Sequence, residues 1–323
     1  MNDLKREVIP FTNEADWLLN RTKDLTSTDI PALFGLSPYH TQRTLWESKK
    51  NPDPTPIEPS KRMKAGQKLE AAIAELIAEE NAFTIEPFKD YIRLPDLRLG
   101  SSFDYKIKWD AGNHEEKILE IKNVSGQFFK SWFNKDNLLE PPYHISLQIQ
   151  HQLLVSGLSK VVVGVLFGGN DYYTIEHTAN PQIQELILDR AAAFWKSVDE
   201  TQPPAFDYDN EKDVELLKKI YGQRYEEGKV LTTPDDEIKA LMEQYIEIGK
   251  DIGKGEKLQQ DIKNDIIERT DGYQKIIGDK WKCQWVMTAD KPDQVITADM
   301  VGQIIKGRKG SNSFRVELPK EKK

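Results

Sequence analysis

The chain has 323 residues and a net charge of −8 at pH 7. It is long enough for one substantial core plus an appendage, and its acidic balance excludes a broadly basic surface, so any contact with nucleic acid needs local basic patches. The single cysteine, Cys283, excludes an intrachain disulfide and a zinc or iron–sulfur site with several Cys ligands, and the lack of any apolar run near ~18 residues or of a signal peptide predicts a cytoplasmic protein without a membrane span.

Residues 21–39, RTKDLTSTDIPALFGLSPY, are typical of a short capped helix. Ser27 or Thr28 suits the cap, and Gly35 suits the end of the helix. The free N–H groups of a helix start, together with the guanidinium of Arg21, also favour a bound phosphate. A hydroxyl-rich helix start is, however, often a cap and nothing more.

Residues 63–77, MKAGQKLEAAIAELI, predict an amphipathic helix on which Glu70 is out of place. Ile73 and Ile77 follow Glu70 by three and seven positions, so its carboxylate lies on or beside the apolar stripe. An unpaired acid there is costly, which predicts a partner such as a metal ion or a lysine. The alternative is a boundary residue that reaches solvent.

Residues 99–109 and 117–124 predict two antiparallel strands joined by a turn of composition DAGNHEE. Pairing brings Asp104 beside Glu120, and strand alternation places Glu120 and Lys122 on one face of the sheet. Two acids and a lysine in this arrangement are suited to hold a divalent metal over a phosphodiester. The alternative is a surface hairpin with solvated charges.

Residues 143–157, YHISLQIQHQLLVSG, predict a helix that ends at its glycine. Gln148 and Gln152 follow Ile145 by three and seven positions, which places neutral amides near the apolar stripe. Such amides can support a site without changing its charge, although glutamines also mark ordinary helix boundaries.

A buried strand over 160–167, a second strand over 172–177 and a helix over 180–198 follow, and Gln202-Pro203-Pro204 ends the core. We therefore expect a core in residues 1–205 and an appendage in residues 206–323. In the appendage, apolar residues after Pro234 mostly follow alternating steps of three and four, which predicts a long helix with a coiled-coil seam. This helix could fold back on the core, form oligomers or bind a partner.

Beyond Gly272, residues 273–288 and 311–318 predict strands around a short helix. Residues 306–310, KGRKG, form a small basic loop that could touch a DNA backbone or could simply be solvated.

In this order, over about residues 15–180, the motifs resemble the YqaJ-like viral recombinase family, the family of phage lambda exonuclease. The matching segments are Arg21 and Thr28 with GLSPY at 35–39, GQKLE at 66–70, GSSFD at 100–104 with EIK at 120–122, and QIQ at 148–150. The resemblance implies a restriction-endonuclease-like PD-(D/E)xK fold of the α/β class, in which helices flank a mixed β-sheet.

The resemblance also implies a role for each matching residue. Asp104, Glu120 and the Ile121 carbonyl would hold the metal, with Glu70 as a further metal-side acid. Lys122 would be the catalytic lysine and Gln148 would support the site. Arg21 with Thr28, or with the neighbouring Ser27, would hold the 5′ phosphate of a strand end.

Two positions depart from the family pattern. Phe103 and Tyr105 flank the aspartate where the family often has proline and glycine, so the resemblance does not fix the local bend of the backbone. The hydroxyl expected to bind the phosphate is Thr28 rather than the commoner serine, which leaves Ser27 as an alternative. Neither departure removes a metal ligand.

The function implied is a Mg²⁺-dependent 5′-to-3′ exonuclease that degrades one strand of duplex DNA from its ends, in phage-type recombination with a single-strand annealing protein. Mn²⁺ should substitute, because it prefers similar oxygen ligands. A homo-oligomer, with a trimeric ring as one form, is also implied. The alternatives are an endonuclease that cuts internally and a catalytically idle scaffold that binds DNA ends.

Overall fold

The computed structural model describes residues 4–11, 13–53, 55, 58–108, 116–222, 224, 235–271, 273–278, 282–287, 294–295, 304–305 and 312–317. The chain forms two compact units, Met1–Glu226 and Glu227–Lys323. The division lies later than the boundary that the sequence predicts after residue 205, because helix α7 (Glu211–Gly222) contacts helix α3 (Gln42–Lys50) of the first unit.

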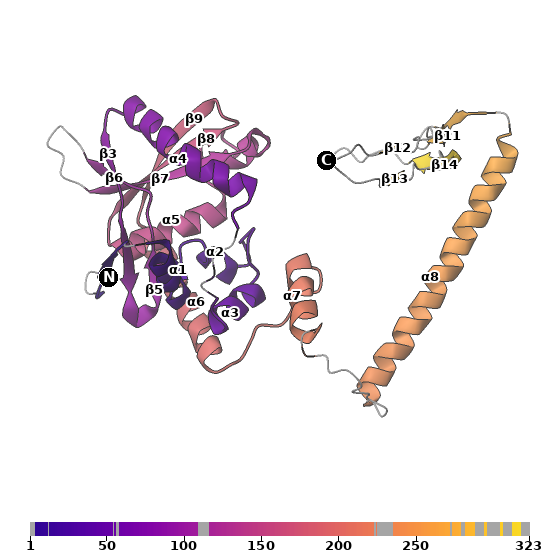
Figure 1. The fold of residues 1–323 in the computed structure, drawn as a ribbon, viewed down its shortest axis with the longest axis horizontal. Helices are drawn as coiled ribbons and strands as arrows, with labels where there is room; N and C mark the ends of the chain where they lie inside the picture. Colours follow the sequence, from indigo (N-terminus) through magenta and orange to yellow (C-terminus); the bar gives the residue numbers. More distant parts are fainter. Residues whose placement is uncertain are drawn as a thin grey trace. The chain divides into compact units, whose positions relative to one another are not determined.

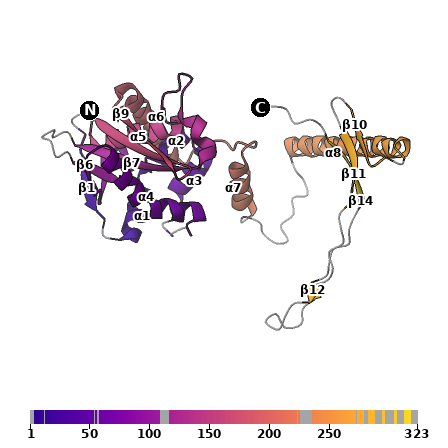
Figure 2. The same cartoon turned by 90° about the horizontal axis from the view of Figure 1, so that it is seen from above.

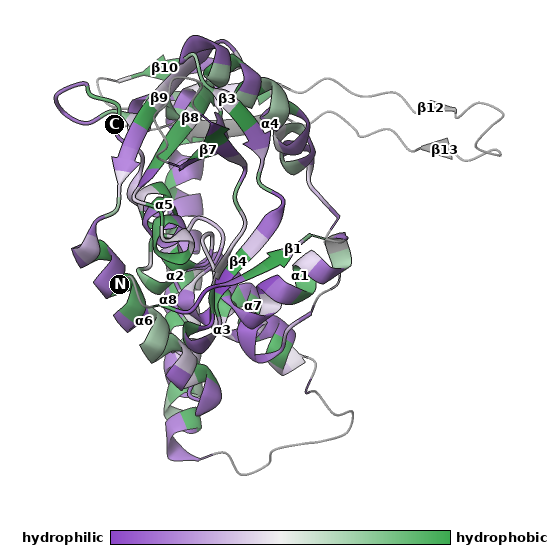
Figure 3. Cartoon of the chain, turned by 90° about the vertical axis from the view of Figure 1, so that its left-hand side faces the viewer, coloured by the Kyte–Doolittle hydropathy of each residue, from purple (hydrophilic) through white to green (hydrophobic). Residues whose placement is uncertain are grey.

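A mixed five-stranded sheet is the centre of the first unit, with the strand order β3-β6-β7-β8-β9. Its strands are β3 (Thr84–Pro87), β6 (Tyr105–Lys108), β7 (Lys117–Val124), β8 (Lys160–Phe167) and β9 (Asp171–Thr178). The β7–β8 pair is parallel and the other pairs are antiparallel. β8 is hydrophobic along most of its length (Figure 3), as expected for a central strand that is covered on both faces.

Helices cover both faces of this sheet (Figure 1). On one face, Ile73 and Ile77 of helix α4 (Lys61–Glu80) pack with Leu119 and Ile121 of β7. On the other face, Ile118 of β7 belongs to the larger core, to which helix α5 (Tyr143–Ser156) contributes. The predicted α/β fold is confirmed, and neighbouring residues of β7 point to opposite faces as strand alternation requires.

A second sheet has the strand order β1-β4-β5-β2. Its strands are β1 (Glu7–Pro10), β4 (Asp90–Leu94), β5 (Leu99–Ser101) and β2 (Leu25–Thr26). The expectation of one continuous strand over 99–109 is therefore wrong: β5 pairs in this sheet, β6 pairs in the central sheet, and the chain crosses between them at residues 102–104. Residues 110–115 of the turn predicted after this segment lie outside the described residues.

The N-terminal helices are α1 (Glu14–Lys23), α2 (Ile30–Leu33) and α3. The prediction that Ser27 or Thr28 caps the short helix is wrong, because the N-cap position of α2 is Asp29. Oδ2 of Asp29 accepts hydrogen bonds from the backbone N–H and the hydroxyl of Thr26, both at 2.9 Å. α2 has only four residues, and a left-handed Gly35 lies just beyond it, as predicted.

The predicted helix over 143–157 is confirmed as α5, with Gly157 as its left-handed C-cap. Arg6 completes this helix end, since its Nε donates to the carbonyl of Val155 at 2.9 Å and its Nη2 donates to the carbonyl of Leu154 at 3.2 Å. The remaining helices of the unit are α6 (Pro181–Asp199), which Asn180 caps, and the 3-10 helices η1 (Pro95–Leu97) and η2 (Gly126–Trp132).

The second unit contains helix α8 (Asp236–Arg269), seen from above in Figure 2. The unit also has strands β10 (Lys275–Ile277), β11 (Lys282–Met287) and β14 (Asn312–Glu317) in one sheet, and β12 (Gln294–Val295) with β13 (Ile304–Ile305) in another. The long helix is present as predicted. The predicted basic loop over 306–310 lies outside the described residues, and no described helix is long and apolar enough to cross a membrane.

Candidate active site

Two carboxylates meet where β6 stops pairing with β7. Tyr105 pairs with Leu119, which makes Asp104 level with Glu120 across the ladder. Asp104 lies just before β6, and its Oδ2 accepts a hydrogen bond from the backbone N–H of Ile121 at 2.7 Å. Because the chain stops pairing between β5 and β6, the side chain of Asp104 can accept a hydrogen bond from the backbone N–H of Ile121, the residue next to Glu120.

Glu120 is buried, with 3% exposure, and both of its oxygens accept hydrogen bonds. Oε1 accepts from Nζ of Lys122 at 2.5 Å and from Nε2 of Gln148 at 2.7 Å. Oε2 accepts from Nε2 of Gln152 at 2.7 Å. Two amides one helical turn apart on α5 thus fix the plane of this carboxylate without cancelling its charge.

Gln152 is a site residue that the sequence prediction did not include. The sequence placed it beside an apolar stripe, and its spacing of four residues from Gln148 was the one signal that both amides could reach the same partner. Gln150, between them, has a different role. Its Nε2 donates to the carbonyl of Thr178 at 2.9 Å, and its Oε1 accepts from the N–H of Asn180 at 2.7 Å, which ties α5 to the junction between β9 and α6.

The cluster is crowded with negative charge. Burial, and then the neighbouring Glu120, raise the pKa of Asp104 well above its usual value. Burial and Glu120 also raise the pKa of Glu70, which places this half-buried acid of α4 within electrostatic reach of the pair. Burial would lower the pKa of Lys122, but Glu120 and Asp104 outweigh it and raise that pKa.

These groups fit a hard divalent cation. The donors are carboxylate oxygens, which Mg²⁺ and Mn²⁺ prefer, and a cation would offset both the burial of Asp104 and its repulsion by Glu120, which raise the pKa of Asp104. Asp104, Glu120 and Glu70 are the side chains that would hold it, with the Ile121 carbonyl as a further expected ligand. Within the described part of the chain, no three His, Cys, Asp or Glu side chains lie close enough together to hold a metal ion as they stand.

The residues expected to bind a 5′ phosphate are Arg21, in the last turn of α1, and Ser27 and Thr28, which lie between α1 and α2. Nη2 of Arg21 donates to Oγ1 of Thr28 at 3.5 Å, and Thr28 is exposed while Ser27 is buried. The guanidinium lies 4.5 Å from the ring centroid of Trp17, whose Nε1 donates to Oγ of Ser102 at 2.8 Å. Ser102 precedes Asp104 by two residues, so side chains connect Arg21 to the segment that carries the acid.

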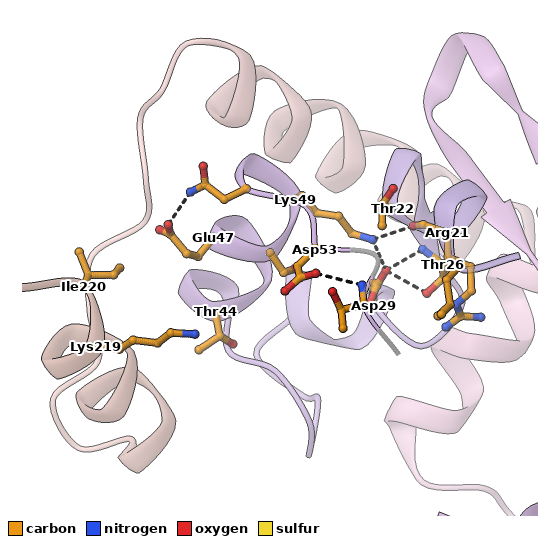
Figure 4. A pocket seen from close by; sticks show the side chains of 14 residues that line it. Arg21, Thr22, Thr26, Asp29, Thr44, Glu47, Lys49, Asp53, Lys219 and Ile220 are labelled. Atoms are coloured by element: carbon orange, nitrogen blue, oxygen red, sulfur yellow. Dashed lines mark hydrogen bonds and ion pairs between the residues drawn. The ribbon is translucent and has the colours of Figure 1, made fainter. Parts of the chain in front are cut away.

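Arg21 also lines a pocket of about 670 Å³, together with residues of α3, α7 and the segment around residue 53 (Figure 4). Inside it, Nζ of Lys49 lies 2.9 Å from Oδ2 of Asp29. Burial opposes ionisation of Asp29, but Lys49 lowers its pKa to about 2. Because Asp29, Glu47 and Asp53 also line the pocket, its cations are largely offset by acids.

Comparison with known proteins finds a family model that matches the part of the chain carrying this site. Residues 16–159 match the profile of the YqaJ-like viral recombinase domain. The chain is 25% identical over 324 residues to the "Uncharacterized protein YqaJ" of Bacillus subtilis (strain 168), which covers 98% of each chain.

Solved structures with a similar fold include an alkaline exonuclease (LHK-Exo) from Laribacter hongkongensis, with a TM-score of 0.44 and 14% identity over 65% of this chain and 99% of that chain. A phage-related exonuclease from Haemophilus somnus 129PT has a TM-score of 0.40 and 10% identity over 57% and 97%. The profile match confirms the resemblance seen in the motifs. The family model that residues 16–159 of this chain match is therefore that of the YqaJ-like viral recombinase domain.

Proposed function

We propose that this protein is a metal-dependent exonuclease that degrades one strand of duplex DNA from its 5′ end, with Mg²⁺ as the natural cofactor and Mn²⁺ as a substitute. The observation that carries the proposal is the cluster in which Asp104 reaches the Ile121 N–H while Lys122, Gln148 and Gln152 hold Glu120. The YqaJ-like viral recombinase domain that surrounds the cluster supports the same conclusion.

The chain contributes orientation and charge. Asp104, Glu120 and Glu70 would hold the cation, and the amides of Gln148 and Gln152 keep Glu120 in one plane. A bound Mg²⁺ would acidify a water molecule and stabilise charge on the leaving oxygen. The ammonium of Lys122, next to this cation site, offsets negative charge on the phosphate that is attacked.

Digestion of end-labelled linear duplex DNA, with and without Mg²⁺, tests this function. Wild-type protein releases nucleotides from the 5′ end only with the metal, and Asp104→Asn lowers the rate by at least about 100-fold. Asp96→Asn, which changes an exposed acid outside the cluster, serves as the matched control and keeps the rate. Equal activity of Asp104→Asn and wild type would mean that the metal site is misassigned.

The same assay on closed and nicked circles separates an exonuclease from an endonuclease. An exonuclease leaves closed circles intact, whereas an internal cutter linearises them. Binding of DNA ends without hydrolysis under any metal would instead indicate an idle end-binding scaffold.

The polarity of digestion depends on the phosphate contact. Arg21→Ala should reduce the preference for 5′-phosphorylated over 5′-hydroxyl ends by about 10-fold or more, because it removes a charge-assisted hydrogen bond to the phosphate. Lys23→Ala, at the exposed end of the same helix, is the control. An equal loss of rate on both kinds of end would contradict the role of Arg21.

Assembly and partners are part of the same proposal. A single-strand annealing protein would take up the strand that remains, and a homo-oligomer, with a closed trimer as one form, would keep the enzyme on its substrate. Sedimentation of the full chain, alone and with duplex DNA, measures the oligomeric state.

A further inference from the structure

A groove of about 790 Å³ lies beside the carboxylate cluster and is separate from the Arg21 pocket. We call it the Tyr39 groove. It is lined by Tyr39, by Ser60, Arg62, Met63, Ala65 and Gly66 around the start of α4, by Asn123, Val124 and Ser125 at the end of β7, and by Gly168 and Gly169.

The groove adjoins the proposed catalytic residues along two elements. On α4, Gly66 precedes Glu70 by one helical turn, so both lie on the same side of the helix. On β7, the groove begins at Asn123, near the end of the strand that carries Glu120 and Lys122, although strand alternation turns the side chains of Lys122 and Asn123 to opposite faces of the sheet. Tyr39 also lies within electrostatic range of Lys122. A strand held at the cluster would therefore extend into this groove.

Tyr39 presents an open aromatic face on a braced loop. Its side chain is 67% exposed, while its backbone N–H donates to Oγ of Ser37 at 3.1 Å. The next N–H, that of His40, donates to the same oxygen at 3.1 Å. Nζ of Lys212 on α7 bonds the carbonyl of Pro38. The backbone is thus fixed while the ring stays available, which is the arrangement of a preformed stacking platform.

The rest of the lining suits a nucleotide. Asn123 and Ser125 are exposed polar side chains that can meet a base edge or a sugar, and Arg62 is an exposed cation that can meet a phosphate. None of the described residues that line the Tyr39 groove is acidic, in contrast to the Arg21 pocket. A Cβ atom built on Gly66 or Gly169 would meet no atom within 4 Å, so the glycines leave the space open.

We propose that the Tyr39 groove binds an unpaired nucleotide of the strand that is cut, with its base stacked on Tyr39 and its polar groups facing Asn123 and Ser125. This inference rests on the proposed exonuclease function and adds to it a subsite for a base. Stacking on an aromatic side chain tolerates all four bases, because each base has a π-face. The groove therefore separates the terminal nucleotide from its pair without reading its sequence.

The test is a binding measurement that does not need hydrolysis. Duplexes carry the fluorescent base 2-aminopurine at one of the first three positions of the 5′-ended strand, or at the matching positions of the complementary strand, and are titrated with the full chain in Ca²⁺. Wild type and Tyr39→Phe should change the emission at one of the first three positions of the 5′-ended strand. Tyr39→Ala should abolish that change and weaken binding about 10-fold or more.

Two controls make the result specific. Tyr208→Ala removes another tyrosine of the same unit, 74% exposed and outside the groove, and should bind like wild type. An abasic residue at the responsive position should weaken wild-type binding by the same factor as Tyr39→Ala, and the two changes together should cost no more than either alone.

The inference is overturned if Tyr39→Ala keeps the emission change, if Tyr208→Ala loses as much affinity as Tyr39→Ala, or if only the complementary strand responds. These outcomes are distinct from failure of the proposed function. Loss of the Tyr39 effect in a protein that still shows Asp104-dependent hydrolysis rejects the subsite alone. A Tyr39-dependent emission change in a wild-type protein that hydrolyses no DNA rejects the nuclease and leaves the base site standing.

Discussion

Glu120 owes its fixed orientation to two neutral amides rather than to a second cation. Gln148 and Gln152 each donate to one oxygen at 2.7 Å, and Lys122 is the one ammonium group among the three side-chain donors described for Glu120. A second lysine or arginine in place of an amide would neutralise the carboxylate and weaken its attraction for a metal ion. The amide pair therefore gives rigidity while keeping the charge that the proposed cofactor requires.

Gln152→Leu is expected to weaken binding of the metal and to lower hydrolysis by about 10- to 100-fold, because Glu120 loses the donor to one oxygen. Calorimetric titration with Mg²⁺ and the end-labelled assay measure the two effects. Gln150→Leu is the matched control on the same helix. It should lower the melting temperature through lost bonds to Thr178 and Asn180 while metal affinity stays unchanged. Equal metal affinity of Gln152→Leu and wild type would contradict the role.

His151 predicts a pH dependence of stability. It is fully buried, and burial lowers its pKa from the ordinary value of about 6.5 to about 3. The unfolded chain takes up this proton first, so the free energy of unfolding falls as the pH decreases from 6.5 toward 3, by up to about 1.4 kcal/mol per pH unit. Above pH 6.5 this loss is absent.

Urea unfolding of the full chain, followed by tryptophan fluorescence from pH 7.5 to 4, checks this dependence. His151→Leu has no proton to take up, so its stability should fall less steeply with decreasing pH than that of wild type. Parallel curves for the two proteins would show that another group controls the acid loss.

At the scale of elements, local sequence patterns predicted α4, α5, β8 and α6 well. The apolar residues of the three helices recur at the helical spacing, β8 is a continuous apolar run, and the helix ends carry clear signals such as Asn180 and Gly157. The crossing at residues 102–104 was not predictable in the same way, because both halves of the segment have strand composition and only tertiary pairing divides them.

The candidate site, like the fold, was predictable from the sequence only in part. The acids Asp104 and Glu120 and the lysine followed from strand alternation and from the family motifs, since these depend on neighbours in the sequence. The contact of Gln152 with Glu120, and the backbone donor that Asp104 takes, depend on how α5 and β6 approach β7. Such distances between separate elements are not encoded in local patterns.

Gly157→Ala is expected to destabilise the first unit. The residue has φ of +78°, and a Cβ atom would lie 2.7 Å from the Cζ atom of Arg6, so backbone strain is added to loss of the helix-end contact. We expect a loss of about 1–2 kcal/mol in the free energy of unfolding. Gly66→Ala, inside α4 with open space around it, should instead gain about 0.5–1 kcal/mol. Thermal unfolding of both variants gives the comparison, and an unchanged melting temperature for Gly157→Ala would reject the strain.

For the whole molecule, the described side chains of the proposed site all lie in the first unit, Met1–Glu226. A chain that ends at Glu226 should therefore keep metal-dependent hydrolysis of short duplexes. If the second unit forms oligomers, the shortened chain should release fewer nucleotides per encounter on long DNA. Single-turnover digestion of short and long substrates, with circular dichroism to confirm folding, measures both. Loss of short-duplex hydrolysis in a folded truncated chain would place part of the site in the second unit.

Helix α8 of the second unit has an exposed apolar side that could pack against three different kinds of helix. α8 has no buried residue among its 34, and its exposed apolar residues include Ile238, Leu241, Tyr245, Ile248 and Ile252. Their spacing fits a seam against another helix, whether of the same chain, of a second copy or of a partner. Sedimentation of the full and shortened chains distinguishes a second copy from the other two.

The unpaired segment over residues 102–104, between β5 and β6, limits how this fold can be redesigned. Asp104 is available to a cation only because the main chain leaves one sheet at Ser101 and joins the other at Tyr105. If β6 were redesigned to pair with β7 for one or two more residues, the N–H of Ile121 would donate to a backbone carbonyl group instead of to Asp104. Asp104 would then lose the hydrogen bond that orients its carboxylate. Longer pairing of β6 with β7 would therefore stabilise the sheet but disrupt the proposed metal site.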